Sequence, residues 1–195
     1  MNLSNPASLD KAYLRDFYLE KRKKLAADFD RKTALNDEIQ TRLIISSAYR
    51  IADTVLVYMA RPFEISTSMI IYAALANNKT VGLPVCLDDR RMIFRKITSV
   101  AELRPGRFGI LEPPQNSEEI VPDEHTLCVC PCLCCDMNGM RLGFGGGYYD
   151  RFLSDFNGVK AALCYGDSVL PAIEGDDFDV PMNVIVTDSF IRNIR

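Results

Sequence analysis

The segment Met140–Leu153 reads MRLGFGGGYYDRFL and carries the strongest signal in the chain. Four of its residues, Gly143 and Gly145–Gly147, are glycines that fall within five positions. Glycine runs are unfavourable inside helices and strands because glycine loses the most backbone freedom on folding. They suit places where the backbone approaches a ligand closely or adopts a positive φ. The residues that follow can start a helix, so the segment predicts a glycine loop that leads into a helix N-terminus.

Such a loop favours an anion. Free backbone N–H groups and the positive end of the helix dipole attract groups such as phosphate. Arg141 and Arg151 place a fixed positive charge on each side of the loop, and Asp150 offers an oxygen ligand of the kind that Mg²⁺ uses. Glycine clusters also occur in flexible surface loops. The charged flanks favour a phosphate site over that alternative.

Two widespread glycine motifs do not fit this segment. The sequence GFGGGY departs from G-x-G-x-x-G because Tyr148 occupies the position of the last glycine, which disfavours a dinucleotide-binding fold. The segment also lacks the G-K-[ST] ending of a P-loop, which disfavours a Walker-type NTPase.

The composition of the 195-residue chain is that of an ordinary globular protein, with 48% hydrophobic and 25% charged residues. This length predicts a single domain spanning residues 1–195. A net charge of −3 gives no sign of a nucleic-acid surface, and no apolar run approaches the length of a membrane span. The first residues lack the apolar core of a signal peptide and include acidic side chains. We therefore expect a cytoplasmic protein with neither nucleic-acid nor membrane partners. A monomer is expected, although the sequence does not fix the oligomeric state.

Helix-like and strand-like segments alternate along most of the chain. Helices are expected at residues 9–27, 31–48, 68–77 and 148–155, with Ser8 capping the first, Asp30 the second, and Ser66 or Thr67 the third. Strands are expected at residues 54–59, 79–85, 92–97, 126–135, 159–165 and 184–187, the second and third forming a hairpin. The predicted class is α/β, with one three-layer domain whose largely parallel, mixed central sheet is flanked by helices.

Five of the seven cysteines lie between Cys128 and Cys135. Zinc sites usually pair two C-x₂₋₄-C knuckles at a distance or add histidines. One extended segment points alternate side chains to opposite faces, and Cys86 and Cys164 stand apart in the sequence. A buried strand with small apolar thiols is therefore favoured over a thiol-based metal or redox protein, which is kept as an alternative. The single histidine, His125, lies in a polar loop and is assigned no role.

The longer segment Asp136–Arg151, DMNGMRLGFGGGYYDR, resembles the signature of the 5-formyltetrahydrofolate cyclo-ligase (methenyltetrahydrofolate synthetase) family. Phe108–Pro113, FGILEP, is similar to the G-I-x-E-P element of that family. Lys11–Arg15, KAYLR, is similar to the basic residue and L-R pair of its first helix. The resemblance extends over almost the full length, from the first helix to the last strand.

The resemblance implies ATP- and Mg²⁺-dependent conversion of 5-formyltetrahydrofolate to 5,10-methenyltetrahydrofolate through an iminophosphate, with release of ADP and phosphate. It implies that ATP is bound by Lys11, Arg15, Arg141, Leu142, Gly143, Phe144, Gly145, Gly146, Gly147, Tyr148 and Tyr149. It further implies folate contacts from Met59, Glu64, Gly145, Gly146, Gly147 and Tyr148, catalytic roles for Arg141 and Tyr148, and Mg²⁺ bound by Asp150. The alternative is a family member that binds folate or nucleotide without turnover.

The chain departs from the family pattern in two places. Asn183 stands where the family often has an aspartate used with the metal site, and Asp177 or Asp179 could substitute for it. The segment PCLCCD, residues 131–136, corresponds to the family's P-G-[LV]-A-F-D pattern, and its three cysteines replace the glycine, alanine and phenylalanine. Without the resemblance, Glu64 would be interpreted as an exposed loop carboxylate. Glu112 is either a polar residue near the site or a loop residue held by the prolines that follow it.

Overall fold

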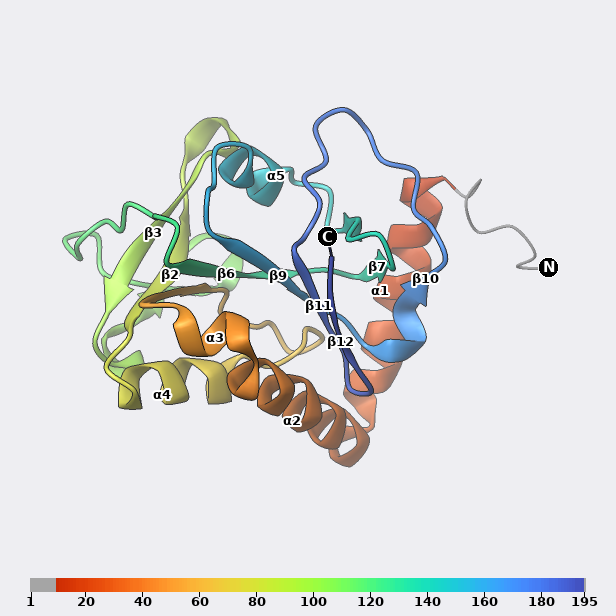
Figure 1. Cartoon of the computed structure of the whole chain (residues 1–195), viewed down its shortest axis with the longest axis horizontal. Coiled ribbons are helices and arrows are strands. Elements are labelled where there is room, and N and C mark those ends of the chain that lie inside the picture. The colour runs from red at the N-terminus through yellow and green to blue at the C-terminus, as the bar shows by residue number, and fades with distance from the viewer. Residues whose placement is uncertain (1–9, 195) are drawn as a thin grey trace.

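The computed structural model describes residues 10–194, and its centre is a seven-stranded sheet in the order β12-β11-β9-β6-β1-β2-β3 (Figure 1). Its strands are β1 (Thr54–Val57), β2 (Thr80–Cys86), β3 (Met92–Ile97), β6 (Thr126–Pro131), β9 (Val159–Leu163), β11 (Val184–Val186) and β12 (Ile191–Asn193). The five inner strands run parallel, and β3 and β12 add an antiparallel strand at each edge. The predicted mixed, largely parallel sheet and the β2–β3 hairpin are confirmed.

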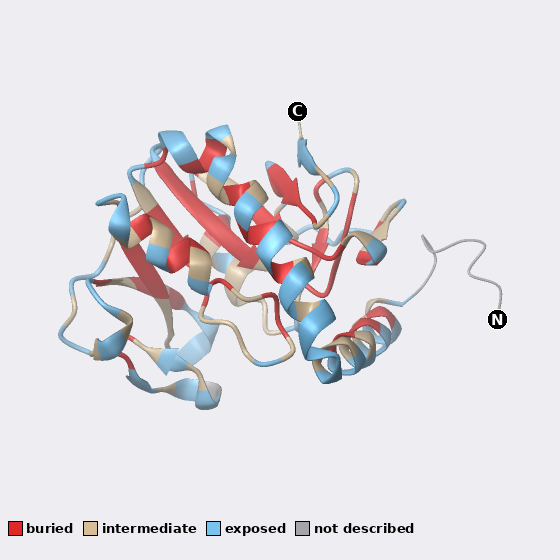
Figure 2. Cartoon of the chain, turned by 90° about the horizontal axis from the view of Figure 1, so that it is seen from below, coloured by how far each residue is buried: buried red, intermediate tan, exposed pale blue. Residues whose placement is uncertain are grey.

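Helices cover both faces of this sheet. The helices α2 (Phe29–Ile45), α3 (Ser47–Ile51) and α4 (Ser68–Ala76) lie on one side, and α5 (Tyr148–Leu153) lies on the other (Figure 1). Side chains alternate across β1, so Val55 and Val57 pack in one apolar cluster with Ile39 of α2, whereas Leu56 packs in a second cluster with Leu153 of α5. Figure 2 shows buried strands between helices that present exposed residues outward.

The helix α1 (Lys11–Ala27) lies beside a smaller sheet in the order β10-β7-β8. Its strands are β7 (Cys134–Asp136), β8 (Arg141–Leu142) and β10 (Val169–Leu170). Leu14 and Tyr18 of α1 pack in a third apolar cluster with Leu133 and Leu142. This packing places α1 next to the point where the glycine loop begins. Elsewhere, β4 (Arg104–Pro105) and β5 (Leu111–Glu112) form an antiparallel pair.

The first helices begin at different residues from those predicted. Ser8 lies outside the described residues, and the carboxylate of Asp10 caps α1 by accepting a hydrogen bond from the N–H of Ala12 at 3.1 Å. The prediction that Asp30 caps the second helix is wrong. Asp28 alone separates α1 from α2, and its carboxylate accepts from the N–H of Arg31. Within residues 10–194, no helix combines the length and apolar character that a membrane crossing needs.

The predicted helix at residues 31–48 is interrupted at Ser46, whose hydroxyl accepts from the N–H of Tyr49 and starts α3. Thr67 occupies the N-cap position of α4, but its hydroxyl donates to the carbonyl oxygen of Tyr58 instead of capping the helix. The hydroxyl of Ser66 accepts from the N–H of Ser68 at 3.4 Å. The helix patterns therefore indicated helical segments correctly and their ends less well.

The predicted strand at residues 126–135 is two strands in different sheets. Its first part is β6, which pairs with β1 and β9, and its second part is β7, which pairs with β8 and β10. The break falls at Cys132 and Leu133, where the N–H of Leu133 donates to the carbonyl oxygen of Leu142 at 2.7 Å. Arg22 of α1 donates from Nη2 to the carbonyl oxygens of both residues at the break. Contacts with distant segments therefore interrupt a run that is free of charged residues.

Candidate active site

The glycine loop, Gly143–Gly147, connects β8 to α5. Gly145 and Gly147 have φ angles of 88° and 68°, in the left-handed region that L side chains rarely adopt. A Cβ atom on Gly146 would lie 2.9 Å from the ring of Tyr148. The course of the loop therefore depends on glycine at three successive positions. Because α5 has only six residues, we attribute any attraction for anions to the loop amides and nearby arginines more than to a helix dipole.

Arg141 and Asp150 join the two ends of the glycine loop. Nη2 of Arg141 donates to Oδ1 of Asp150 at 2.9 Å, and the arginine is only 7% exposed. Its Nη1 lies 3.2 Å from the position of a Cβ on Gly143, so the guanidinium lies against the loop. Nε of Arg141 is buried and has no hydrogen-bond partner within residues 10–194. An unsatisfied buried donor costs free energy, so this guanidinium can still gain from a further acceptor.

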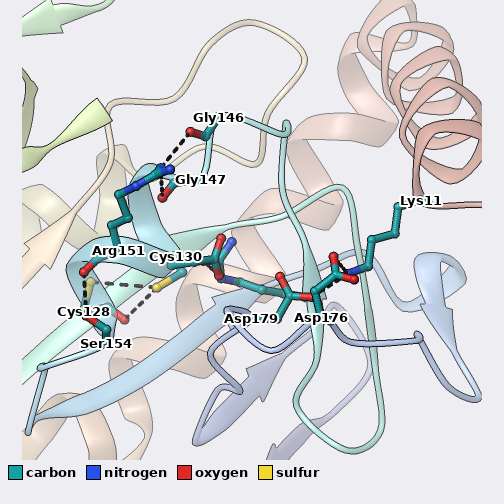
Figure 3. Close-up of polar contacts among 11 residues, drawn as sticks. Lys11, Cys128, Cys130, Gly146, Gly147, Arg151, Ser154, Asp176 and Asp179 are labelled. Carbon is teal, nitrogen blue, oxygen red and sulfur yellow. Dashed lines mark hydrogen bonds and ion pairs between the residues drawn. The ribbon is translucent and has the colours of Figure 1, made fainter. Parts of the chain in front are cut away.

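Arg15 reaches the same loop from α1. Its Nε donates to the carbonyl oxygen of Gly143 at 3.3 Å and lies 3.4 Å from the position of a Cβ on Gly145. Arg151, on the far side of the loop, donates from Nη1 to the carbonyl oxygen of Gly147 at 3.1 Å (Figure 3). The structure therefore brings three of the predicted arginines to the glycine loop.

Lys11 lies one turn before Arg15 and has different partners. Its Nζ is 2.6 Å from a carboxylate oxygen of Asp176 and equally far from one of Asp179 (Figure 3). Burial lowers the pKa of Lys11, but the hydrogen bonds and charges of the two aspartates outweigh burial and raise it. Lys11 therefore remains charged, and a phosphate would have to compete with two carboxylates for it.

The loop between β1 and α4 contacts the glycine loop through aromatic rings. The rings of Phe63 and Phe144 lie 6.0 Å apart, and the guanidinium of Arg61 lies 4.7 and 4.3 Å from their centroids. Nη2 and the backbone N–H of Arg61 donate to the carboxylate of Glu64 at 2.9 and 2.7 Å. Glu64 is 7% exposed, so the alternative of an exposed loop carboxylate is wrong. The structure brings Glu64 and the glycine loop into one neighbourhood.

The two tyrosines at the start of α5 differ in their surroundings. The hydroxyl of Tyr149 is buried without a hydrogen-bond partner in the described part of the chain, and burial raises its pKa well above the usual value. Its ring lies 5.5 Å from the guanidinium of Arg141. Tyr148 is half-buried, with its ring against Gly146. Among the other predicted contacts, Leu142 is buried, Met59 is half-buried against the cluster that contains Val55 and Val57, and Phe144 is 37% exposed.

A buried aspartate supports the turn that leads into this site. Oδ1 of Asp136 accepts hydrogen bonds from the N–H groups of Asn138 and Met140 at 2.8 and 2.9 Å. Its Oδ2 accepts from the N–H of Ile173 at 2.9 Å. Asp136 therefore fixes the β7–β8 turn immediately before Arg141. Asp136 begins the signature segment, and this position could have identified it as a site residue. The sequence analysis nevertheless assigned it no role.

Of the acidic positions considered beside Asp150, Asp179 fits best. Burial raises its pKa, but the hydrogen bond and charge of Lys11, with the charge of Arg141, outweigh burial and lower it. Oδ1 of Asn183, by contrast, accepts from the N–H of Lys160 at 2.9 Å and so fastens the start of β9. Sequence reasoning missed the pairing of Asp176 and Asp179 with Lys11, because their irregular segment has no periodic signal.

Glu112 is better described as a loop residue than as part of this site. Its Oε1 accepts a hydrogen bond from the N–H of Arg107 at 3.2 Å. Burial raises the pKa of Glu112, and the backbone hydrogen bonds that it accepts oppose that shift. A Cβ on Gly106 would lie 2.3 Å from its carboxyl carbon, so the side chain folds back on its own turn.

Comparison with known proteins shows which family the chain resembles. A family model described as the 5-formyltetrahydrofolate cyclo-ligase family matches residues 7–188. The 5-formyltetrahydrofolate cyclo-ligase of Haemophilus influenzae is 30% identical over 139 residues, which cover 68% of this chain and 74% of that protein. The probable 5-formyltetrahydrofolate cyclo-ligase of Schizosaccharomyces pombe is 30% identical over 158 residues, which cover 72% and 78%.

Solved structures share the fold. The 5,10-methenyltetrahydrofolate synthetase of Aquifex aeolicus superposes with a TM-score of 0.82 at 29% identity, covering 95% of this chain and 93% of that one. A 5,10-methenyltetrahydrofolate synthetase of Mycoplasma pneumoniae has a TM-score of 0.74 at 22% identity, which supports the fold alone. The family match runs from before α1 to beyond β11 and includes the glycine loop and the loop that carries Glu64. The chain therefore belongs to the 5-formyltetrahydrofolate cyclo-ligase family.

Proposed function

We propose that this protein converts 5-formyltetrahydrofolate to 5,10-methenyltetrahydrofolate in an ATP- and Mg²⁺-dependent reaction that releases ADP and phosphate. The observation that carries the proposal is the glycine loop, which Arg15 and Arg141 contact on one side and which lies against the loop of Glu64 on the other. Family membership supports the choice of folate substrate. The proposal includes a cytoplasmic monomer whose residues 1–195 form a single domain.

The phosphates of ATP would be held by the glycine loop and its arginines. The amide N–H groups of Gly143–Gly147 suit close approach by an anion, since left-handed glycines keep side chains out of the way. The unpartnered Nε of Arg141 is consistent with a guanidinium that gains a further acceptor when nucleotide binds. Arg15 supplies a second fixed charge. Lys11 would join them by exchanging its aspartate partners for phosphate oxygens.

Mg²⁺ fits the oxygen donors on this side of the loop. It usually binds through one or two carboxylates together with substrate phosphates and retained waters. Oδ1 of Asp150 accepts from Arg141, so Oδ2 is the oxygen that would face the ion. Asp179 is a second carboxylate in the field of the same arginine. When bound, Mg²⁺ would neutralise part of the phosphate charge.

The chemistry asks the protein mainly for positioning and charge stabilisation. The formyl oxygen attacks the γ-phosphorus of ATP, and ADP departs to leave an iminophosphate. N10 of the folate then attacks the activated carbon and releases its proton to solvent. The bond between that carbon and the former formyl oxygen breaks, and phosphate departs with that oxygen to leave the methenyl ring. Arg141 would stabilise the charge that develops during phosphoryl transfer. Met59, Glu64 and Tyr148 would hold the folate against Gly145–Gly147.

The direct test mixes purified protein with 5-formyltetrahydrofolate, Mg²⁺ and ATP, and follows the near-ultraviolet absorbance of 5,10-methenyltetrahydrofolate. The expected result is a rise that needs all three additions and is matched by equimolar ADP. Reactions lacking ATP or Mg²⁺ are the controls. If folded, reduced protein binds folate or nucleotide in a calorimeter but gives no rise, the proposal fails and the binding-only alternative takes its place.

A further inference from the structure

Three thiols from separate parts of the sequence meet in the interior. Cys132 lies at the break between β6 and β7, Cys135 lies within β7, and Cys164 follows β9. Their sulfur atoms all lie within 4.8 Å of one another, and all three residues are buried. The expectation that Cys164 stands apart, and that one extended segment keeps the other cysteines from converging, is therefore wrong. The strand break turns Cys132 and Cys135 toward the end of β9.

A buried arginine beside this cluster has no anionic partner in the described part of the chain. Arg22 is 3% exposed, and its Nη2 donates to the carbonyl oxygens of Cys132 and Leu133 at 2.9 and 3.3 Å. Its guanidinium lies 4.3 Å from the ring centroid of Tyr165, the residue after Cys164. Within residues 10–194 it forms no ion pair with a carboxylate, and its Nε has no hydrogen-bond partner. Buried charges are normally paired, so a negative charge close to the Arg22 guanidinium would stabilise it.

We propose that Cys132, Cys135 and Cys164 form a binding site for a thiophilic divalent cation of the zinc class. Each thiol releases its proton to solvent as its sulfur forms a bond to the ion. Three thiolates and a divalent ion carry one net negative charge together, and the guanidinium of Arg22 balances it. The charge balance favours a divalent ion over a monovalent one. This inference goes beyond the proposed folate chemistry and does not depend on it.

The sulfur geometry suits such an ion after a small contraction. Zinc–sulfur bonds are about 2.3 Å long, which places sulfurs around one ion at about 4 Å from each other. The S–H of Cys132 donates to the carbonyl oxygen of Leu163 at 3.2 Å, and this hydrogen bond is exchanged for the bond to the ion. Three protein ligands leave a fourth position for water.

The remaining thiols do not belong to this site. Cys128 and Cys130 form a separate pair, with their sulfurs 3.8 Å apart on β6 (Figure 3). Cys134 packs in the cluster with Leu14 and Tyr18 of α1, and Cys86 is half-buried on β2. The buried thiol of Cys134, adjacent in sequence to a proposed ligand, is therefore the matched control.

The position of the site gives the ion a structural task. Cys135 pairs with Arg141 across β7 and β8, directly before the glycine loop, whereas Cys164 follows a strand of the central sheet. A metal ion would therefore cross-link the strands that carry the glycine loop to the main sheet. Metal binding to the folded state stabilises it by mass action, so the melting temperature should rise with metal concentration.

The first experiment titrates reduced, metal-free protein with Zn²⁺, and with Co²⁺ as a spectroscopic probe. The wild type and Cys134→Ala are expected to bind about one ion per chain, with sulfur-to-cobalt charge-transfer bands and a raised melting temperature. Cys164→Ala is expected to bind no ion, and therefore to show neither the charge-transfer bands nor the increase in melting temperature. Equal binding by Cys164→Ala, or loss of binding in Cys134→Ala alone, would overturn the assignment.

A second measurement needs only the wild type, in case Cys164→Ala does not fold. The protein is held close to its melting temperature, where buried thiols become reachable through transient opening, and is treated there with a small alkylating reagent with and without Zn²⁺. Modified peptides are identified by mass spectrometry. The ion should protect Cys132, Cys135 and Cys164, with no change at Cys86. The proposal is overturned if reduced protein binds no stoichiometric metal. It is equally overturned if two of the three sulfurs are joined as a disulfide that persists in reductant and excludes the ion.

Discussion

Nη2 of Arg141 lies 2.9 Å from Oδ1 of Asp150, so the residues on the two sides of the glycine loop form one ion pair. The pair aims the guanidinium at the loop and uses one carboxylate oxygen. The same carboxylate can therefore orient the arginine and bind a metal ion at once. If the carboxylate has both roles, removal of either residue changes more than one step.

Asp150→Asn keeps an oxygen that can accept from Arg141 but removes the negative charge. If Oδ2 binds Mg²⁺, the Mg²⁺ concentration for half-maximal activity should rise at least about tenfold, with little change in stability. Initial rates measured against Mg²⁺ at saturating ATP check this. Asp155→Asn, an exposed change just after α5, is the control and should behave as wild type. An unchanged Mg²⁺ requirement in Asp150→Asn would refute the ligand role.

Arg141→Ala removes the buried guanidinium from the glycine loop. The loss of a charge that stabilises phosphoryl transfer should lower kcat/KM for ATP about 100-fold or more. Arg141→Lys should recover only part of it, because an ammonium cannot contact both the loop and Asp150 as a guanidinium does. Steady-state kinetics at varied ATP give the comparison, with the exposed Arg31→Ala as control. A normal ATP dependence in Arg141→Ala would contradict the phosphate role.

Gly147→Ala places a side chain where φ is 68°. The left-handed backbone should cost about 1–2 kcal/mol of unfolding free energy, or the loop should change course to avoid it. Gly109→Ala has nearly the same φ, 69°, and a Cβ there would meet no atom of the described residues within 4 Å, apart from its chain neighbours. Urea unfolding should show a similar loss in both variants, whereas ATP-dependent activity should fall sharply only in Gly147→Ala. Equal activity in the two would argue against a role for the loop geometry.

Asp179→Asn should remove a pH-dependent part of the stability. The pKa of Asp179 is lower in the folded protein than its ordinary value of 3.8, despite opposing burial, because Lys11 favours the charged form. Stability from such a carboxylate is fully present above the ordinary pKa and is lost as the pH falls through the folded one.

Because the pair is partly exposed, the difference between wild type and Asp179→Asn should stay below about 1 kcal/mol at neutral pH. This difference in unfolding free energy should become smaller as the pH falls. Thermal unfolding from neutral pH downward measures it, with the exposed Asp177→Asn as a variant that should show no such trend. A difference that grows on acidification would show that the sign of the linkage is wrong.

The sheet could be predicted from local patterns, and the convergence of distant segments could not. The apolar run that contains β1 has the length and β-branched content of a strand buried on both faces, and the structure places it inside the sheet. The break after β6 was missed because residues 126–135 contain no turn signal strong enough to divide them. It depends on Leu142 and on Arg22, which are far away in sequence.

The candidate site shows the same division. The glycine loop, Arg141 and Arg151 could be singled out because their spacing carries chemical meaning within one short segment, whereas Arg15 was expected only from the family resemblance. The sequence analysis assigned no role to Arg61, although a spacing of three residues between opposite charges is a weak signal for a pair. The meeting of Cys164 with Cys132 depends on the register between β6 and β9, in which Pro131 pairs with Leu163. Sequence alone does not supply that register.

The contact of the Arg61 guanidinium with the rings of both Phe63 and Phe144 has a thermodynamic consequence. The same guanidinium contacts Glu64, so the glycine loop and the carboxylate proposed to bind the folate share one side chain. A nucleotide that shifts Phe144 would change the affinity for folate, and folate would change the affinity for nucleotide by the same factor, because linkage is reciprocal. Calorimetry with a non-hydrolysable ATP analogue and folate, added in either order, would measure that coupling. In Arg61→Ala the two affinities should become independent.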